Sequence, residues 1–169
     1  MRCECCGIVS RVHASNGRRH HEEDRKEQED IRSTPKKLFA SAPSPPLPLT
    51  LSLEAYSGLY NHKAYGDFEF RLRTYKESGY QHPLRETHAS DSVLYGEPEY
   101  LHSNLVLHHV SGEHWLVGEN MFIRVQDVPN SYSKAQFEIG LDGQVEAVKI
   151  VLEPSLQGEA AWAVFTKVK

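Results

Sequence analysis

Two runs of alternating apolar and polar residues flank an Asp-Gly pair near the C-terminus, and this feature most constrains the fold. The first run spans residues 137–141 and the second spans 145–152, with Asp142-Gly143 between them. Alternation with a period of two predicts strands with one buried face. Asp-Gly favours a two-residue hairpin turn, because both turn positions need a positive φ. The apolar positions change phase between Val145 and Val148, which predicts a bulge in the second strand.

Further short runs follow the same pattern earlier in the chain. Residues 51–59 predict a short helical turn, with Thr50 or Ser52 as its cap and Glu54 in the first turn. Residues 111–113 predict a turn between two strands. The expected strands are 68–72, 92–95, 104–110, 114–117, 120–125 and 161–168. Together with the hairpin they give six to eight short antiparallel strands, which predict an all-β barrel or sandwich.

The first 50 residues have a different composition. Residues 18–37 are dense in charges of both signs, and Ile31 is their only aliphatic residue. Such a segment buries too little apolar surface to offset its ordering entropy, so it favours at most a transient solvated helix. Four prolines in residues 42–48 favour an extended linker. We expect residues 1–46 to be a disordered charged and Pro-rich tail, and residues 47–169 to be the folded domain.

Charge and composition exclude several functions. The net charge of −4 predicts no nucleic-acid partner. No apolar run approaches the ~20 residues of a membrane helix, and the N-terminus lacks the apolar core of a secretion signal, so we expect no membrane association and a cytoplasmic location by default. All three cysteines, Cys3, Cys5 and Cys6, lie in the tail. The folded part therefore has no disulfide framework, and the compartment and the role of these cysteines stay open.

One short motif matches a catalytic spacing. Ser33-Thr-Pro-Lys36 fits Ser-x-x-Lys, the nucleophile and base of β-lactamase-like enzymes. That chemistry needs both side chains on one helical turn inside a cleft, with the lysine desolvated. Here Pro35 separates them among solvated charges, and the downstream partner motifs are missing. We expect no catalytic residue in this chain.

Metal ligation is also disfavoured by spacing. Cys3-x-Cys5-Cys6 has no second cysteine pair, although His13, His20 and His21 follow it. In the domain, His108 and His109 point to opposite faces of one strand and cannot chelate one ion. His114 is across the turn from them and could approach one. We interpret His62, His102, His108, His109 and His114 mainly as surface residues, and expect no metal and no cofactor.

An aromatic group gathers at the start of the domain. It comprises Tyr56, Tyr60, Tyr65, Phe68 and Phe70, and Trp115 joins it as a candidate barrel-end or ligand-lining residue. Small barrels hold apolar ligands, but ordinary core packing explains such a group more simply. The barrel interior separates the two hypotheses, because a filled interior leaves no room for a ligand. The expected interior residues are Phe68, Phe70, Leu72, Leu107, Trp115, Phe137 and Ile150.

These residues carry a resemblance to a known family. The domain opens with the pattern Leu53-x-x-Tyr56-x-Gly58-x-Tyr60-Asn61, followed by Tyr65-Gly66 and an alternating strand. This pattern resembles the opening of the lipocalin-like C-terminal domain of serine β-lactamase-related, penicillin-binding-protein-like hydrolases. The proline-rich approach and the 137–145 hairpin also resemble that domain, and the stretch 110–115 resembles fungal members. The chain departs from the pattern at 61–64, where the usual proline is absent.

The resemblance covers residues 47–169 and implies an about eight-stranded lipocalin-like barrel or half-barrel. It implies a non-catalytic accessory domain that packs on a β-lactamase-like catalytic domain or mediates oligomerisation, here as a fragment or truncated gene product. No catalytic residue can be transferred, because the Ser-x-x-Lys domain of such proteins lies upstream. The alternatives are a free-standing lipocalin-like binder of an apolar ligand and, ranked last, an enzyme in its own right. The ligand, the parent substrate and the oligomeric state stay open.

Overall fold

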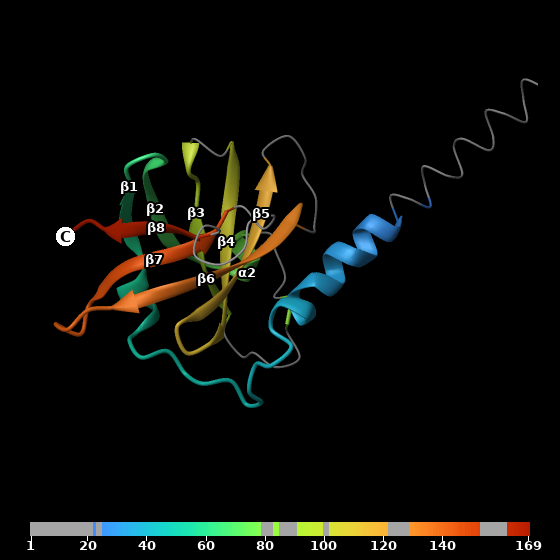
Figure 1. Ribbon diagram of the computed structural model, residues 1–169, viewed down its shortest axis with the longest axis horizontal. Helices are drawn as coiled ribbons and strands as arrows, with labels where there is room; N and C mark the ends of the chain where they lie inside the picture. Colours follow the sequence, from blue (N-terminus) through green and yellow to red (C-terminus); the bar gives the residue numbers. More distant parts are fainter. Residues whose placement is uncertain are drawn as a thin grey trace, which may run out of the picture.

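The chain folds into a closed antiparallel barrel of eight strands in the order β1 to β8, which confirms the expected fold class (Figure 1). This computed structural model describes residues 22, 25–78, 83–84, 91–99, 102–121, 129–152 and 162–169. Each strand pairs with the next one along the chain, and β8 pairs with β1 to close the barrel. The strands are β1 Gly58–His62, β2 Gly66–Thr74, β3 Ser92–Gly96, β4 Ser103–Ser111, β5 His114–Met121, β6 Ser131–Ile139, β7 Val145–Val151 and β8 Trp162–Lys167.

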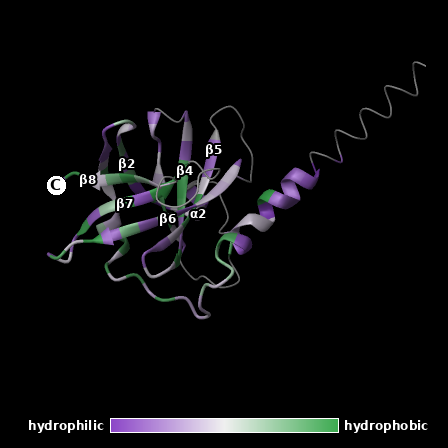
Figure 2. Ribbon diagram, viewed as in Figure 1, coloured by the Kyte–Doolittle hydropathy of each residue, from purple (hydrophilic) through white to green (hydrophobic). Residues whose placement is uncertain are grey.

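Alternation decides which face of each strand enters the core. Phe68 and Phe70 of β2 are buried, whereas Glu69 between them is exposed. Closure removes the free edges that an open sheet would present, so the apolar faces converge on one interior. Figure 2 shows apolar and polar segments mixed along the same strands, as this arrangement requires.

The C-terminal hairpin forms where it was expected, but its loop is longer than two residues and includes Leu141, which was expected in the strand and is exposed. Gly140 N donates to Gln144 O over 2.8 Å, and Gly143 N donates to Gly140 O over 3.0 Å. Among the loop residues only Gly143 has a positive φ, of 75°. This is the three-residue loop in which a turn is followed by one left-handed glycine. The predicted bulge is confirmed, because Glu146 lies between the pairs Glu138↔Ala147 and Ile139↔Val145 without a partner of its own.

Three elements of the barrel differ from the sequence prediction. The expected strands 114–117 and 120–125 form one continuous strand, β5, up to Met121, and residues 122–125 lie outside the described part. Gly118 lies within this strand, where an added Cβ would lie only 2.9 Å from Pro129 Cγ. The expected helical turn over 51–59 is only the short helix η1, Leu53–Tyr56, whose cap position is Ser52. Strand β1 was not predicted and starts directly after it.

The region before the barrel carries a helix. Residues 25–38 are helical, whereas the sequence predicted a tail with at most a transient solvated helix (Figure 1). Pro35 is buried, and Lys134 Nζ of β6 lies 5.5 Å from the ring centroid of Phe39, so the end of this helix meets the barrel. Residues 42–48 are not helical, as their prolines predicted. The domain boundary at residue 46/47 stays a prediction. A second short helix, α2 Tyr75–Ser78, follows β2.

Candidate functional site

Aromatic side chains form a continuous column through the barrel interior. Neighbouring ring centroids along the column lie 4.8 to 6.1 Å apart, mostly in tilted or edge-to-face arrangements. Such geometry is the preferred packing of aromatic pairs and stabilises them beyond the burial of their area. In order, the column is Trp115, Tyr56, Phe137, Tyr60, Phe70, Phe68, Phe165 and Tyr65.

All six aromatic residues picked out as barrel-end or ligand-lining candidates belong to this column. Five of them are fully or nearly fully buried, and Tyr65 is partly buried against the core. The expected interior residues are also in the core, with Leu72 half-buried at its margin. The column therefore places these residues along the barrel as packing partners, and it adds Phe165, which the sequence did not single out.

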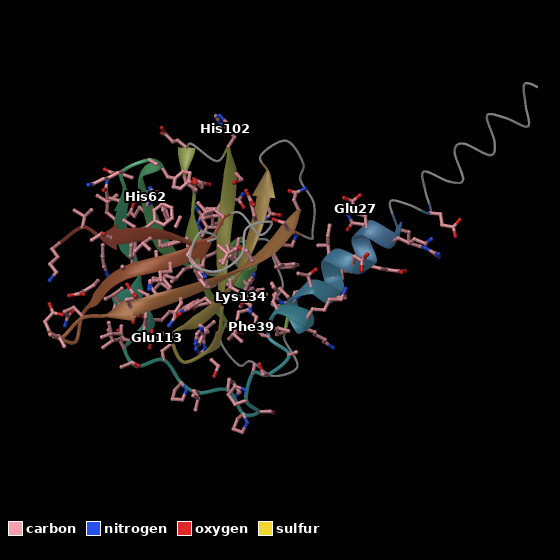
Figure 3. All side chains as sticks on the ribbon, viewed as in Figure 1. Glu27, Phe39, His62, His102, Glu113 and Lys134 are labelled. Carbon is pink, nitrogen blue, oxygen red and sulfur yellow. The ribbon has the colours of Figure 1, made fainter. Side chains whose placement is uncertain are left out.

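The chain that enters the barrel is held by the turn between β4 and β5. Leu47 N donates to Ser111 Oγ over 3.0 Å, and Gly112 N donates to Leu47 O over 2.9 Å. Glu113 then accepts a hydrogen bond from Thr50 N at Oε1 over 3.1 Å. We call these contacts, together with Tyr56 Oη on Glu113, the linker junction. Figure 3 shows Glu113 on the side of the barrel where the linker passes.

Tyr56 joins the junction to the aromatic column. Its hydroxyl donates to Glu113 Oε1 over 3.0 Å and accepts from Leu51 N over 3.3 Å. Burial, followed by the bond to the Glu113 carboxylate, raises the pKa of Tyr56 to about 12. The Tyr60 hydroxyl donates to Tyr56 O over 2.7 Å, and burial likewise raises the pKa of Tyr60.

Two buried polar atoms beside Tyr56 have no hydrogen-bond partner among the residues that the structure describes. They are Glu113 Oε2 and Trp115 Nε1. One accepts hydrogen bonds and the other donates them. A buried polar group without a partner costs free energy. The hydrogen bonds of the linker junction offset part of that cost at this end of the barrel.

The histidines do not form a ligand set. His108 and His109 lie on opposite faces, as predicted, because His109 packs 5.3 Å from Trp115 inside and His108 stacks 5.5 Å from Tyr75 outside. The surface interpretation was wrong for His108, which is fully buried. Tyr75 of α2 covers it and shares a 2.8 Å hydrogen bond with its Nδ1. His114 is exposed, and it pairs with Ser111 across the turn.

Among the described residues no group of three potential metal ligands comes together. Cys3, Cys5, Cys6, His13, His20 and His21 lie outside those residues. No helix of the described part is long and apolar enough to cross a membrane.

The remaining catalytic candidate is Ser33-x-x-Lys36. Ser33 Oγ donates to Asp30 O over 2.9 Å in the helix, and Lys36 is exposed. A serine hydroxyl bonded back to its own helix is not aligned with a lysine that could take its proton.

A polar cluster at the opposite end of the interior was missed by the sequence analysis. Ser103 Oγ donates to Glu119 Oε1 over 3.0 Å, and Ser131 Oγ donates to Glu119 Oε2 over 3.2 Å. The three side chains come from β4, β5 and β6 and point inward by strand alternation. Only the register of three separate strands brings them together, so no local motif could have revealed them.

Comparison with known proteins adds one structural similarity. No protein-family model matches the chain, and no curated protein matches it. Among solved structures the chain is similar to the C-terminal domain of a penicillin-binding protein, with 18% sequence identity and a TM-score of 0.43. The match covers 75% of this chain and 94% of that domain.

Proposed function

We propose that this chain is a non-catalytic accessory barrel of the kind that follows the catalytic domain of β-lactamase-related serine hydrolases. Its task is to pack on such a catalytic domain or to mediate self-association. The observation that carries the proposal is the linker junction. The barrel uses the β4–β5 turn and Tyr56 to fix the chain that precedes it.

Three residues of the resemblance, Tyr56, Gly58 and Tyr60, support the proposal because they lie in this junction or beside it. Tyr56 binds Glu113, and Tyr60 donates to Tyr56 O. Gly58 has a φ of +120°, which a residue with a Cβ adopts only with strain. Lys167 Nζ donates to Ala55 O over 2.5 Å and ties the last strand to the same segment. A barrel that orders its incoming chain can hold a fixed orientation relative to a preceding domain.

The chemistry of the described residues supports a non-catalytic role. One Ser-x-x-Lys pair, Ser33 and Lys36, lies on the helix before the barrel, with Ser33 bonded to Asp30 O. The other, Ser131 and Lys134, lies on β6, where residues three apart point to opposite faces of the strand. The test is hydrolysis of a chromogenic β-lactam and of a nitrophenyl ester by the purified full chain. We expect no turnover above that of the Ser33→Ala variant. Turnover that a single substitution abolishes would contradict the proposal.

The fragment hypothesis has its own test. We expect the reading frame 5′ of this sequence to encode a Ser-x-x-Lys domain, and mapping of the transcript's 5′ end decides this. A transcript that begins at Met1, with no such frame upstream, would remove the fragment hypothesis. Analytical ultracentrifugation of the full chain separates self-association from packing on a second domain.

The alternative function, a binder that holds an apolar ligand inside the barrel, receives no support from the interior. Phe68, Phe70, Trp115 and Phe137 are in the core, each 4% exposed or less. A ligand at that place would have to displace packed aromatic rings.

A further inference from the structure

A groove lies outside the barrel, between the end of the helical segment and the outer face of the sheet. Its volume is about 670 Å³, which lies within the range of small-molecule sites. The apolar part of its lining includes Leu38, Phe39, Pro43 and Trp162. Figure 3 places Phe39 and Lys134 close together where the helical segment meets the barrel.

Three polar side chains of strands β5 and β6 line the same groove. They are His114 of β5 and Lys134 and Gln136 of β6. His114 pairs with Gln136, so these two are neighbours on the outer face, and Lys134 follows two residues along the same strand. Within the described part of the chain, the side chains of Lys134, Gln136 and His114 make no hydrogen bond or ion pair, although Lys134 Nζ lies 5.5 Å from the ring centroid of Phe39.

Lys134 and Trp162 share one row of the outer face. Ala135 pairs with Ile150, and Trp162 pairs with Val151, the next residue of β7. Ala135 and Ile150 are buried, so their neighbours Lys134, Val151 and Trp162 point outward. The Lys134 ammonium lies 5.5 Å from the ring centroid of Phe39 on the helical side, and Trp162 lines the same groove from the sheet.

Lys134 differs from the next lysine on this face in having no carboxylate partner among the described residues. Lys149 of β7 pairs with Glu138, with 2.6 Å between Nζ and Oε1. Among the described residues that line the groove, the one carboxylate is Glu113, which lies at the turn and accepts hydrogen bonds at Oε1 from Thr50 N and Tyr56 Oη. An anion at the Lys134 end thus meets an unpaired cation, and the acidic residue lies at the other end.

From these contacts we infer that the groove between residues 38–47 and the outer face of β5, β6 and β8 binds a small organic anion with an apolar body. The carboxylate or sulfonate binds Lys134 Nζ and the Gln136 amide, and the alkyl or aromatic body lies between Phe39 and Trp162. A charge-assisted hydrogen bond to a partly buried lysine supplies orientation, and the aromatic walls supply apolar contact. This site is separate from the barrel interior and does not rest on the accessory-domain proposal.

The probe is anilinonaphthalene sulfonate, an anion with an aromatic body, titrated into the full chain by fluorescence. Decanoate should displace it, whereas decylamine should not, because the cation would meet Lys134. Lys134→Met should weaken binding of the probe and of decanoate by about tenfold, the equivalent of about 1.4 kcal/mol. Trp162→Ala should weaken the binding of decanoate and of the neutral decanol to the same extent.

Lys149→Met is the matched control, because it removes a lysine of the same face that already has a carboxylate partner. It should leave the affinity for the probe unchanged. Lys134→Arg keeps the positive charge and should bind the probe almost as tightly as the wild type. Comparing it with Lys134→Met shows whether weaker binding comes from the lost charge or from misfolding. Equal affinities for wild type, Lys134→Met and Lys149→Met, or displacement of the probe by decylamine as effectively as by decanoate, would overturn the inference.

Discussion

The bond between Tyr56 and Glu113 should be the main energetic link of the linker junction. Tyr56 is fully buried, and its hydroxyl lies 3.0 Å from Glu113 Oε1. A hydrogen bond to a charged partner contributes about 1.5–3 kcal/mol, and leaving a buried hydroxyl without its acceptor costs free energy in the same range. The bond from Thr50 N to the same oxygen is exposed and should add about 0.5 kcal/mol.

One term opposes this stabilisation. Glu113 Oε2 is buried without a partner, and removing the carboxylate relieves its desolvation, which offsets about 1 kcal/mol. Glu113→Ala should therefore lower the free energy of unfolding by about 1–2.5 kcal/mol. At roughly 4 °C per kcal/mol for a domain of this size, the melting temperature should fall by about 4–10 °C.

The assay is a double-mutant cycle of Glu113→Ala and Tyr56→Phe, measured by urea and thermal denaturation followed by circular dichroism. We expect a coupling free energy of about 1–1.5 kcal/mol, because both changes remove the same bond. Ser57→Ala is the control, since its hydroxyl makes an exposed bond to Glu54 O in the same segment. It should change stability by less than about 0.5 kcal/mol. A coupling free energy below about 0.3 kcal/mol would refute the reasoning, because pairs of distant, independent residues deviate from additivity by about that much.

Three further perturbations follow from the same packing. The pKa of Tyr56 is raised from 10.0 to about 12, so between these pH values the folded state keeps a proton that the unfolded state loses. The free energy of unfolding should therefore fall by about 1.4 kcal/mol per pH unit in that range. In urea titrations at successive pH values, Tyr56→Phe should make this fall smaller. Gly58→Ala should lower the free energy of unfolding by about 1–2 kcal/mol, because the backbone φ there is +120°. The loss should exceed that of Gly143→Ala, because a Cβ at Gly58 would also lie 3.3 Å from Lys167 Cε, whereas a Cβ at Gly143 meets open space. Equal melting temperatures for the two variants would contradict this. Phe137→Ala should cost about 3–5 kcal/mol in urea denaturation, because its ring contacts four others of the column; a loss below about 1 kcal/mol would mean that the column is not the core.

The elements that the sequence predicted are those whose signal is local. Strands β2 and β7 carry their burial pattern in consecutive residues, so period two reveals them, and the bulge at Glu146 appears as a change of phase. Strand β1 has no comparable run. Its start depends on the φ of Gly58 and on pairing with β2, and both depend on tertiary contacts rather than on propensity.

The histidines illustrate a second limit. Alternation correctly placed His108 and His109 on opposite faces, but it gave no information on what covers the outer face. His108 is buried because Tyr75, 33 residues earlier, stacks on it. Burial outside a barrel is a property of packing between distant segments, and a single sequence does not encode it in any short pattern.

The linker junction and the groove depend on the same stretch of chain. Leu47 is hydrogen-bonded to Ser111 and Gly112, and residues 38–47 form the outer wall of the groove. The Tyr56–Glu113 bond acts on the barrel side of that attachment. Because the wall is anchored at Leu47, we expect loosening of the junction to release residues 38–47, whereas Lys134 and Trp162 are held in strands β6 and β8. The β4–β5 turn thus fixes the incoming chain and, by the same contacts, shapes the one groove wall that the sheet does not supply.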